Sequence, residues 1–208
     1  YVLIFLLLIF AFFRLLFPKY FNDLFRLFFR TTLKQRQIRE QLMQTPLPSL
    51  LFNCFFVATT ALYFDFLLIH FKLTPINDFW LMYLYCGIGL SVIYLGKFLG
   101  LKFSGWVFNM EEATDAYIFI IFIVNKVIGI FLLPFLVLLA FAGGNIYLVA
   151  LAVSLSGIAI LLAYRFILSY NAVRNQIKVN LFHFFLYICA FEIVPLLLIY
   201  KTLLFFFR

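Results

Sequence analysis

The sequence predicts an all-α integral membrane protein, a six-helix transmembrane bundle with an amphipathic interfacial helix between the first two spans. Hydrophobic residues make up 67% of the 208 residues and charged residues only 12%, too few to cover the surface of a water-soluble domain of this size. The apolar residues form continuous runs near the length that a helix needs to cross a bilayer, without the alternation of barrel strands. Both observations favour helices that cross a lipid bilayer.

Six apolar runs are long enough, or nearly so, to cross the membrane. Short or polar segments separate them, such as KLTPIND at 72–78 and the AGGN turn at 142–145. We expect one transmembrane domain over 1–208, with spans at about 1–17, 49–71, 79–98, 118–141, 146–168 and 181–205. Because the chain opens with Tyr1 inside an apolar run, we also expect it to be part of a longer protein.

The net charge of +8 indicates membrane orientation and not nucleic-acid binding, because the basic residues lie mostly between the apolar runs. If the loop 19–48 is cytoplasmic, twelve Lys and Arg residues lie inside and three outside. We therefore expect both ends of the chain on the non-cytoplasmic side. The inside residues are Arg14, Lys19, Arg26, Arg30, Lys34, Arg36, Arg39, Lys97, Lys102, Arg165, Arg174 and Lys178. The outside residues are Lys72, Lys201 and Arg208.

The first loop carries a basic amphipathic segment, 19–45, at the predicted cytoplasmic surface. On a helix, its cations share one face and its apolar residues share the other. The cations are Lys19, Arg26, Arg30 and Lys34, and the apolar residues are Phe21, Leu24, Phe25 and Phe28. We expect a surface helix with its cations toward lipid headgroups. The alternative is a basic extension of the first span that stands in water.

Small residues recur along the fifth span and predict close helix packing. The stripe consists of Ala152, Ser156, Ala159 and Ala163. Small side chains let helix backbones approach closely where lipid provides no hydrophobic drive for association. We expect this helix to be buried among the others or against a partner subunit.

Polar residues inside the spans are few, and such groups usually face protein or water. They are Asp65, His70, Asn125, Lys126, His183 and Glu192. At a rise of 1.5 Å per residue, Lys126 lies about 12 Å from the cytoplasmic start of the fourth span. Glu192 lies about 16 Å from the cytoplasmic end of the sixth span. The similar depths favour a charge pair between them. The pair could lock two helices together, or it could line a proton path. Alternatively, Lys126 could extend toward the interface and Glu192 could meet another subunit.

Known catalytic, cofactor and metal motifs are missing from the sequence. EEATDAY at 111–117 begins like the Glu-Glu motif of intramembrane prenyl-protein endopeptidases, but no Arg follows at the expected place. VSLSG at 153–157 lacks the first glycine of a rhomboid-type serine motif. Cys54, Cys86 and Cys189 stand singly, without the spacing of a zinc site. We expect no enzyme activity, no cofactor and no metal.

The second half of the chain resembles an uncharacterised membrane family of Bacteroidota that carries only a domain-of-unknown-function label. The similar segments follow the patterns GWxFN, NKxxGIxLLP and LYICxxExxPLLxxYK, within about residues 50–205. The resemblance implies a cytoplasmic-membrane protein. It implies no activity and assigns no catalytic residue.

Two functions fit these features. The first is a non-enzymatic subunit or scaffold of an inner-membrane complex, in envelope biogenesis or protein export, whose partners are lipids and other membrane subunits. The alternative is a small ion- or proton-coupled transporter or channel that uses Lys126 and Glu192. An inverted repeat would favour transport, and the two halves of the chain show only loosely similar proline contexts at Pro134 and Pro195.

Overall fold

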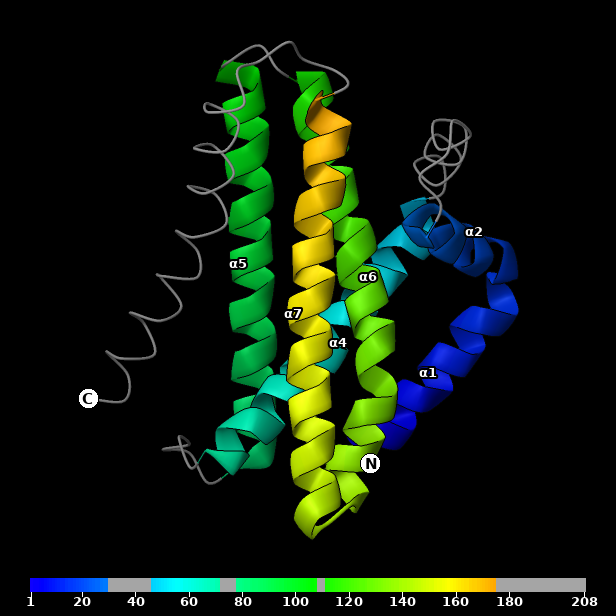
Figure 1. Ribbon diagram of the computed structural model, residues 1–208, viewed down its shortest axis with the longest axis vertical. Helices are drawn as coiled ribbons and strands as arrows, with labels where there is room; N and C mark the ends of the chain where they lie inside the picture. The colour runs from blue at the N-terminus through cyan, green and yellow to red at the C-terminus, as the bar shows by residue number, and fades with distance from the viewer. Residues whose placement is uncertain (30–45, 72–77, 108–110, 175–208) are drawn as a thin grey trace, which may run out of the picture.

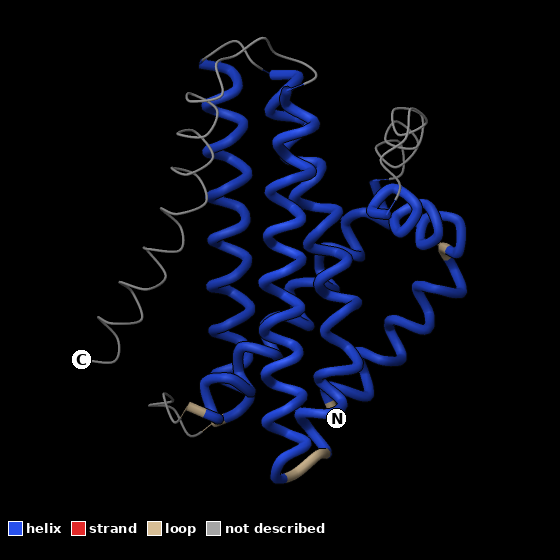
Figure 2. Tube along the Cα trace, viewed as in Figure 1, coloured by secondary structure: helices blue, strands red, loops and turns tan. Residues whose placement is uncertain are grey.

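The computed structural model describes residues 1–29, 46–71, 78–107 and 111–174. All regular structure in these ranges is helical (Figure 2), as the sequence predicts. The helices are α1 Val2–Leu16, α2 Pro18–Phe29, α4 Pro46–His70, α5 Phe79–Val107, α6 Glu111–Phe141 and α7 Gly144–Arg174.

Helix α6 is the centre of the bundle and contacts α1, α2, α4, α5 and α7. Most of its length is buried, with Val124, Leu132 and Leu136 completely enclosed. Helices α5 and α7 stand beside it, and α4 crosses obliquely behind (Figure 1). A helix that is apolar around its whole circumference is expected at such a position.

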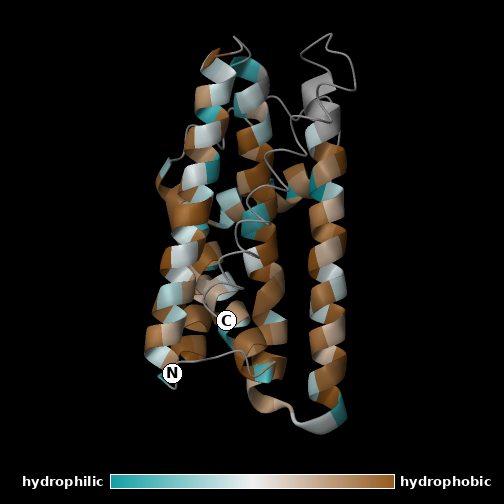
Figure 3. Ribbon diagram, turned by 90° about the vertical axis from the view of Figure 1, so that its left-hand side faces the viewer, coloured by the Kyte–Doolittle hydropathy of each residue, from teal (hydrophilic) through white to brown (hydrophobic). Residues whose placement is uncertain are grey.

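Four helical stretches are long and apolar enough to cross a membrane: Pro46–His70, Phe79–Val107, Thr114–Phe141 and Gly144–Ser169. Hydrophobic residues run along the long helices (Figure 3). The pair formed by α1 and α2 adds a fifth span only if both helices are counted as one bent unit. The chain is therefore a multi-pass membrane protein. The predicted sixth span, 181–205, lies outside the described residues.

The first predicted span, 1–17, corresponds to α1, and the chain bends sharply where this helix ends. Helix α1 has 15 residues and rises about 22 Å. The chain then turns by 95° into α2. The turn falls at Phe17, whose φ of −124° and ψ of 52° are not helical. Pro18 explains this, because a proline disfavours the helical conformation in the residue before it and is well suited to the first turn of the next helix.

The segment 99–117, which connects the third and fourth predicted spans, is helical for most of its length. Helix α5 continues through Val107 and α6 already begins at Glu111. Lys102 Nζ lies 2.6 Å from Asp115 Oδ1 and links the two helices near this end of the bundle, hereafter the α5–α6 end. Glu111 and Glu112 occupy the first turn of α6, where acidic residues stabilise the positive end of the helix dipole.

Two glycines permit close approach and a sharp turn. A Cβ atom on Gly129 of α6 would lie only 2.9 Å from the Cα atom of Phe56 on α4, so the crossing of these helices requires glycine. At the other end of the bundle, Gly144 has a φ of +58° and connects α6 to α7 in a tight hairpin.

Candidate functional site

Lys126 lies at the junction of three helices and is the most enclosed cation of the predicted polar interior. Its side chain is only 3% exposed. The Nζ atom donates hydrogen bonds to Tyr20 Oη of α2 at 2.9 Å and to Ser49 Oγ of α4 at 2.7 Å. It also lies 5.6 Å from the centre of the Tyr20 ring, within the range of a cation–π interaction. Two hydroxyl groups and an aromatic face therefore surround the lysine, which we call the Lys126 site.

The predicted partner of Lys126 is not tested by the structure, because Glu192 lies outside the described residues. His183 lies outside them as well. Within the described ranges, Lys126 Nζ donates hydrogen bonds to the uncharged hydroxyls of Tyr20 and Ser49. The pair of Lys126 with Glu192 therefore stays a prediction.

Asp65 is the buried acidic residue of the described spans. It is completely enclosed, and neither carboxylate oxygen has a hydrogen-bond partner among the described residues. It lies within electrostatic range of Cys86 on α5. Asp65 follows Ser49 by 16 positions on α4, so it lies about 24 Å further along the helix axis. Asp65 is therefore too far along α4 to pair with Lys126.

Asn125 and His70 occupy different environments. Asn125 is 1% exposed, and its Oδ1 atom has no hydrogen-bond partner within the described part of the chain. His70 is half-buried at the end of α4, and its ring centre lies 5.1 Å from that of Tyr147 on α7. The structure therefore brings Asn125 into the interior, and it places His70 at the edge of the bundle.

The small-residue stripe of α7 faces outward in the described structure. Ala152, Ser156, Ala159 and Ala163 are all exposed. The opposite side of α7 packs inward, where Ser154 Oγ and Tyr63 Oη of α4 are 2.7 Å apart and Gly157 meets the Phe131 ring. The expectation that the stripe is buried among the other helices is therefore not met by the described helices.

Helix α2 has the predicted amphipathic character. Lys19 and Arg26 are exposed, whereas Leu24 and Phe28 are buried. Arg30 and Lys34, the other predicted headgroup residues, lie outside the described residues. Tyr164 of α7 donates a hydrogen bond of 2.9 Å to the carbonyl oxygen of Phe28. Helix α2 is therefore attached to the bundle through its apolar face, with two cations on the other side.

Sequence reasoning missed Tyr20 and Ser49 as partners of Lys126. The three residues are separated by up to 106 positions in the chain, and hydroxyl-bearing residues carry no distinctive signal. One feature could have indicated Tyr20. It lies beside the apolar face of an amphipathic segment, where a tyrosine hydroxyl needs a polar partner when the ring is buried.

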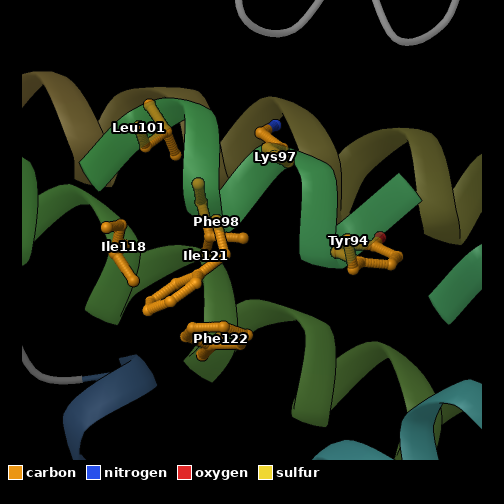
Figure 4. A pocket seen from close by; sticks show the side chains of 7 residues that line it. All are labelled: Tyr94, Lys97, Phe98, Leu101, Ile118, Ile121 and Phe122. Carbon is orange, nitrogen blue, oxygen red and sulfur yellow. The ribbon is translucent and has the colours of Figure 1, made fainter. Parts of the chain in front are cut away.

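A small hollow between α5 and α6 lies apart from these groups (Figure 4). Its volume of about 10 Å³ is roughly the room that one water molecule needs. Apolar and aromatic side chains dominate its lining, which consists of Tyr94, Lys97, Phe98, Leu101, Ile118, Ile121 and Phe122. Among the described residues, no group of three or more His, Cys, Asp and Glu side chains could hold a metal ion.

Comparison with known proteins gives a family and no activity. No curated protein and no solved structure matches the chain. A family model described as a domain of unknown function, DUF4271, matches residues 1–203. The match covers the α1–α2 bend, the Lys126 site and the exposed face of α7, so it also includes the chain before residue 50, where the resembling segments begin. The chain therefore belongs to the DUF4271 family.

Proposed function

We propose that the protein is a non-enzymatic subunit or scaffold of a bacterial inner-membrane complex, such as one for envelope biogenesis or protein export. The observation that supports this most directly is the outward orientation of the α7 stripe. Four small side chains at helical spacing present a smooth face, on which another helix can pack at short distance. Ser156 fits this face, because its hydroxyl already bonds to the Val153 carbonyl oxygen at 3.0 Å and requires no water.

The surroundings of this face agree with a packing role. Helix α5 is also largely uncovered by the described residues, and Gly89 and Gly96 on its outer side have no atom within 4 Å of an added Cβ. Lipid alone would tolerate large side chains at all these positions. Small residues therefore support contact with a helix, either from another subunit or from the predicted span 181–205 of the same chain.

Site-specific photocrosslinking in the native membrane tests the proposal. A benzoylphenylalanine at Ala159 should form a crosslink to another protein, identified by mass spectrometry. The same group at Leu8, an exposed position of α1, serves as the control for random collisions. An Ala159→Leu variant should lose the copurifying partner and keep its own thermal stability. Crosslinks from Ala159 that reach only residues 181–205 of the same chain would contradict the subunit role of this face.

A second candidate function is proton- or ion-coupled transport with Lys126 and Glu192 in the path. It is supported by oxygens of Asp65 and Asn125 that are buried without partners among the described residues, since a proton, an ion or water could satisfy them. Flux through proteoliposomes would distinguish the two functions. A flux that is unchanged by Glu192→Gln would reject the role of Glu192.

A further inference from the structure

The Lys126 site is electrostatically incomplete in the described structure. An ammonium group has three N–H donors and no acceptor. Two donors have partners, Tyr20 Oη at 2.9 Å and Ser49 Oγ at 2.7 Å. Both partners are uncharged, so the hydrogen bonds leave the positive charge unbalanced. A buried charge is strongly disfavoured unless an opposite charge accompanies it.

The local structure adds positive potential at the same place. Ser49 lies in the first turns of α4, a 25-residue helix that begins at Pro46. The amino-terminal end of a helix carries partial positive charge and attracts anions. The hydroxyls of Tyr20 and Ser49 can accept from the ammonium and donate to a further oxygen at the same time. Ammonium, helix end and hydroxyl donors all favour an anionic oxygen.

Two of the described carboxylates, Asp65 and Asp115, do not meet this need. Asp65 has no hydrogen-bond partner among the described residues, so it does not bond to Lys126. Asp115 lies against Lys102 near the α5–α6 end. We infer that Lys126, Tyr20 and Ser49 form a binding site for one anionic oxygen group, a carboxylate or a phosphate. The carboxylate source would be Glu192 of this chain. The phosphate source would be an anionic lipid headgroup that enters past half-buried Ser49, beneath α2.

Thermal unfolding of the full chain in neutral detergent, with and without added phosphatidylglycerol, tests this inference. Phosphatidylcholine is the lipid control. Lys126→Met removes the ammonium, and Glu192→Gln removes the internal carboxylate. Lys19→Gln removes an exposed cation of α2 and controls for general attraction of anionic lipid to this helix.

Two results support the inference and identify the source. If Glu192 fills the site, Glu192→Gln and Lys126→Met should lower the Tm by similar amounts, and the double variant should lose no more. If lipid phosphate fills it, phosphatidylglycerol should raise the Tm by several degrees and remain bound in native mass spectra. That effect should disappear in Lys126→Met and persist in Lys19→Gln and Glu192→Gln.

The inference is overturned if Lys126→Met changes the Tm independently of both Glu192 and phosphatidylglycerol, or does not change it at all. If Lys126→Met does not fold, the Tyr20→Phe, Ser49→Ala double variant keeps the ammonium and permits the same comparison. In that variant, Glu192→Gln or added phosphatidylglycerol should change the Tm by less than in the parent protein. An unchanged effect on the Tm would count against the site. The Lys126 site does not involve the outer face of α7. The crosslinking test of the subunit role can therefore fail while the anion site holds, or the reverse.

Discussion

At the scale of single residues, hydroxyl groups supply hydrogen bonds that link the helices in the described part of the polar interior. Tyr20 and Ser49 bond to Lys126, and Tyr63 bonds to Ser154. Such bonds need less desolvation than buried charges, and in membrane helices each contributes about 0.6 kcal/mol on average. Asp65 differs from these groups, because it is enclosed and, like Asn125 Oδ1, has no hydrogen-bond partner within the described ranges.

We expect Asp65→Asn to leave the free energy of unfolding unchanged or to raise it by up to about 2 kcal/mol. The substitution removes a buried charge and breaks no described interaction. Unfolding in mixed micelles of increasing denaturing detergent would measure the change. Asp115→Asn is the matched control, because Asp115 is partly exposed beside Lys102 and should lose at most about 1 kcal/mol. A loss of about 3 kcal/mol or more for Asp65→Asn would mean that the carboxylate has an essential partner elsewhere.

At the scale of helices, the sequence predicted which segments are helical better than where they end. The runs at 118–141 and 146–168 lie within helices, and the run at 49–71 passes the end of α4 at His70 by one residue. The end of the third span was missed because Lys97 and Lys102 lower the hydropathy without interrupting the helix, and Lys102 pairs with Asp115 across to α6. The bend at Phe17 is a consequence of Pro18, which hydropathy alone does not detect.

The crossing of α4 and α6 makes a second prediction. Gly129→Ala should lower the free energy of unfolding by about 1–3 kcal/mol, because the new methyl group would press against the backbone of Phe56 at 2.9 Å. Detergent unfolding of the purified protein would measure the loss. Gly96→Ala on the exposed side of α5, where nothing lies within 4 Å, should be neutral or stabilising by up to about 1 kcal/mol through helix propensity. Equal effects of the two substitutions would refute the close crossing.

At the scale of the whole molecule, the sequence predicted a helical membrane protein, and the structure confirms this. The partners of Lys126 could not be predicted, because they depend on how α2 folds back against α4 and α6 after the bend. The sequence also could not predict that the α7 stripe faces away from the other described helices. The stripe predicts close packing, but its periodicity does not identify the helix that packs against it.

The orientation prediction can be tested directly on the whole molecule. In a variant without Cys54, Cys86 and Cys189, single cysteines are placed at Glu112, near the α5–α6 end, and at Asn145, in the hairpin. Because the basic residues predict a cytoplasmic α5–α6 end, a membrane-impermeant maleimide should label Asn145→Cys in intact spheroplasts. It should label Glu112→Cys only in inverted vesicles. The reverse pattern would overturn the assigned orientation.

The attachment of α2 at two points has a mechanical consequence. Tyr20 near its start is bonded to Lys126 of α6, and the Phe28 carbonyl oxygen near its end is bonded to Tyr164 of α7. A helix that floats at the headgroup plane follows that plane when the bilayer thins or thickens. Since both ends of α2 are tethered to long helices, it cannot follow without straining one of these bonds. If α2 lies at the headgroup plane, as its amphipathic sequence predicts, membrane thickness would thereby be coupled to the packing of α6 and α7.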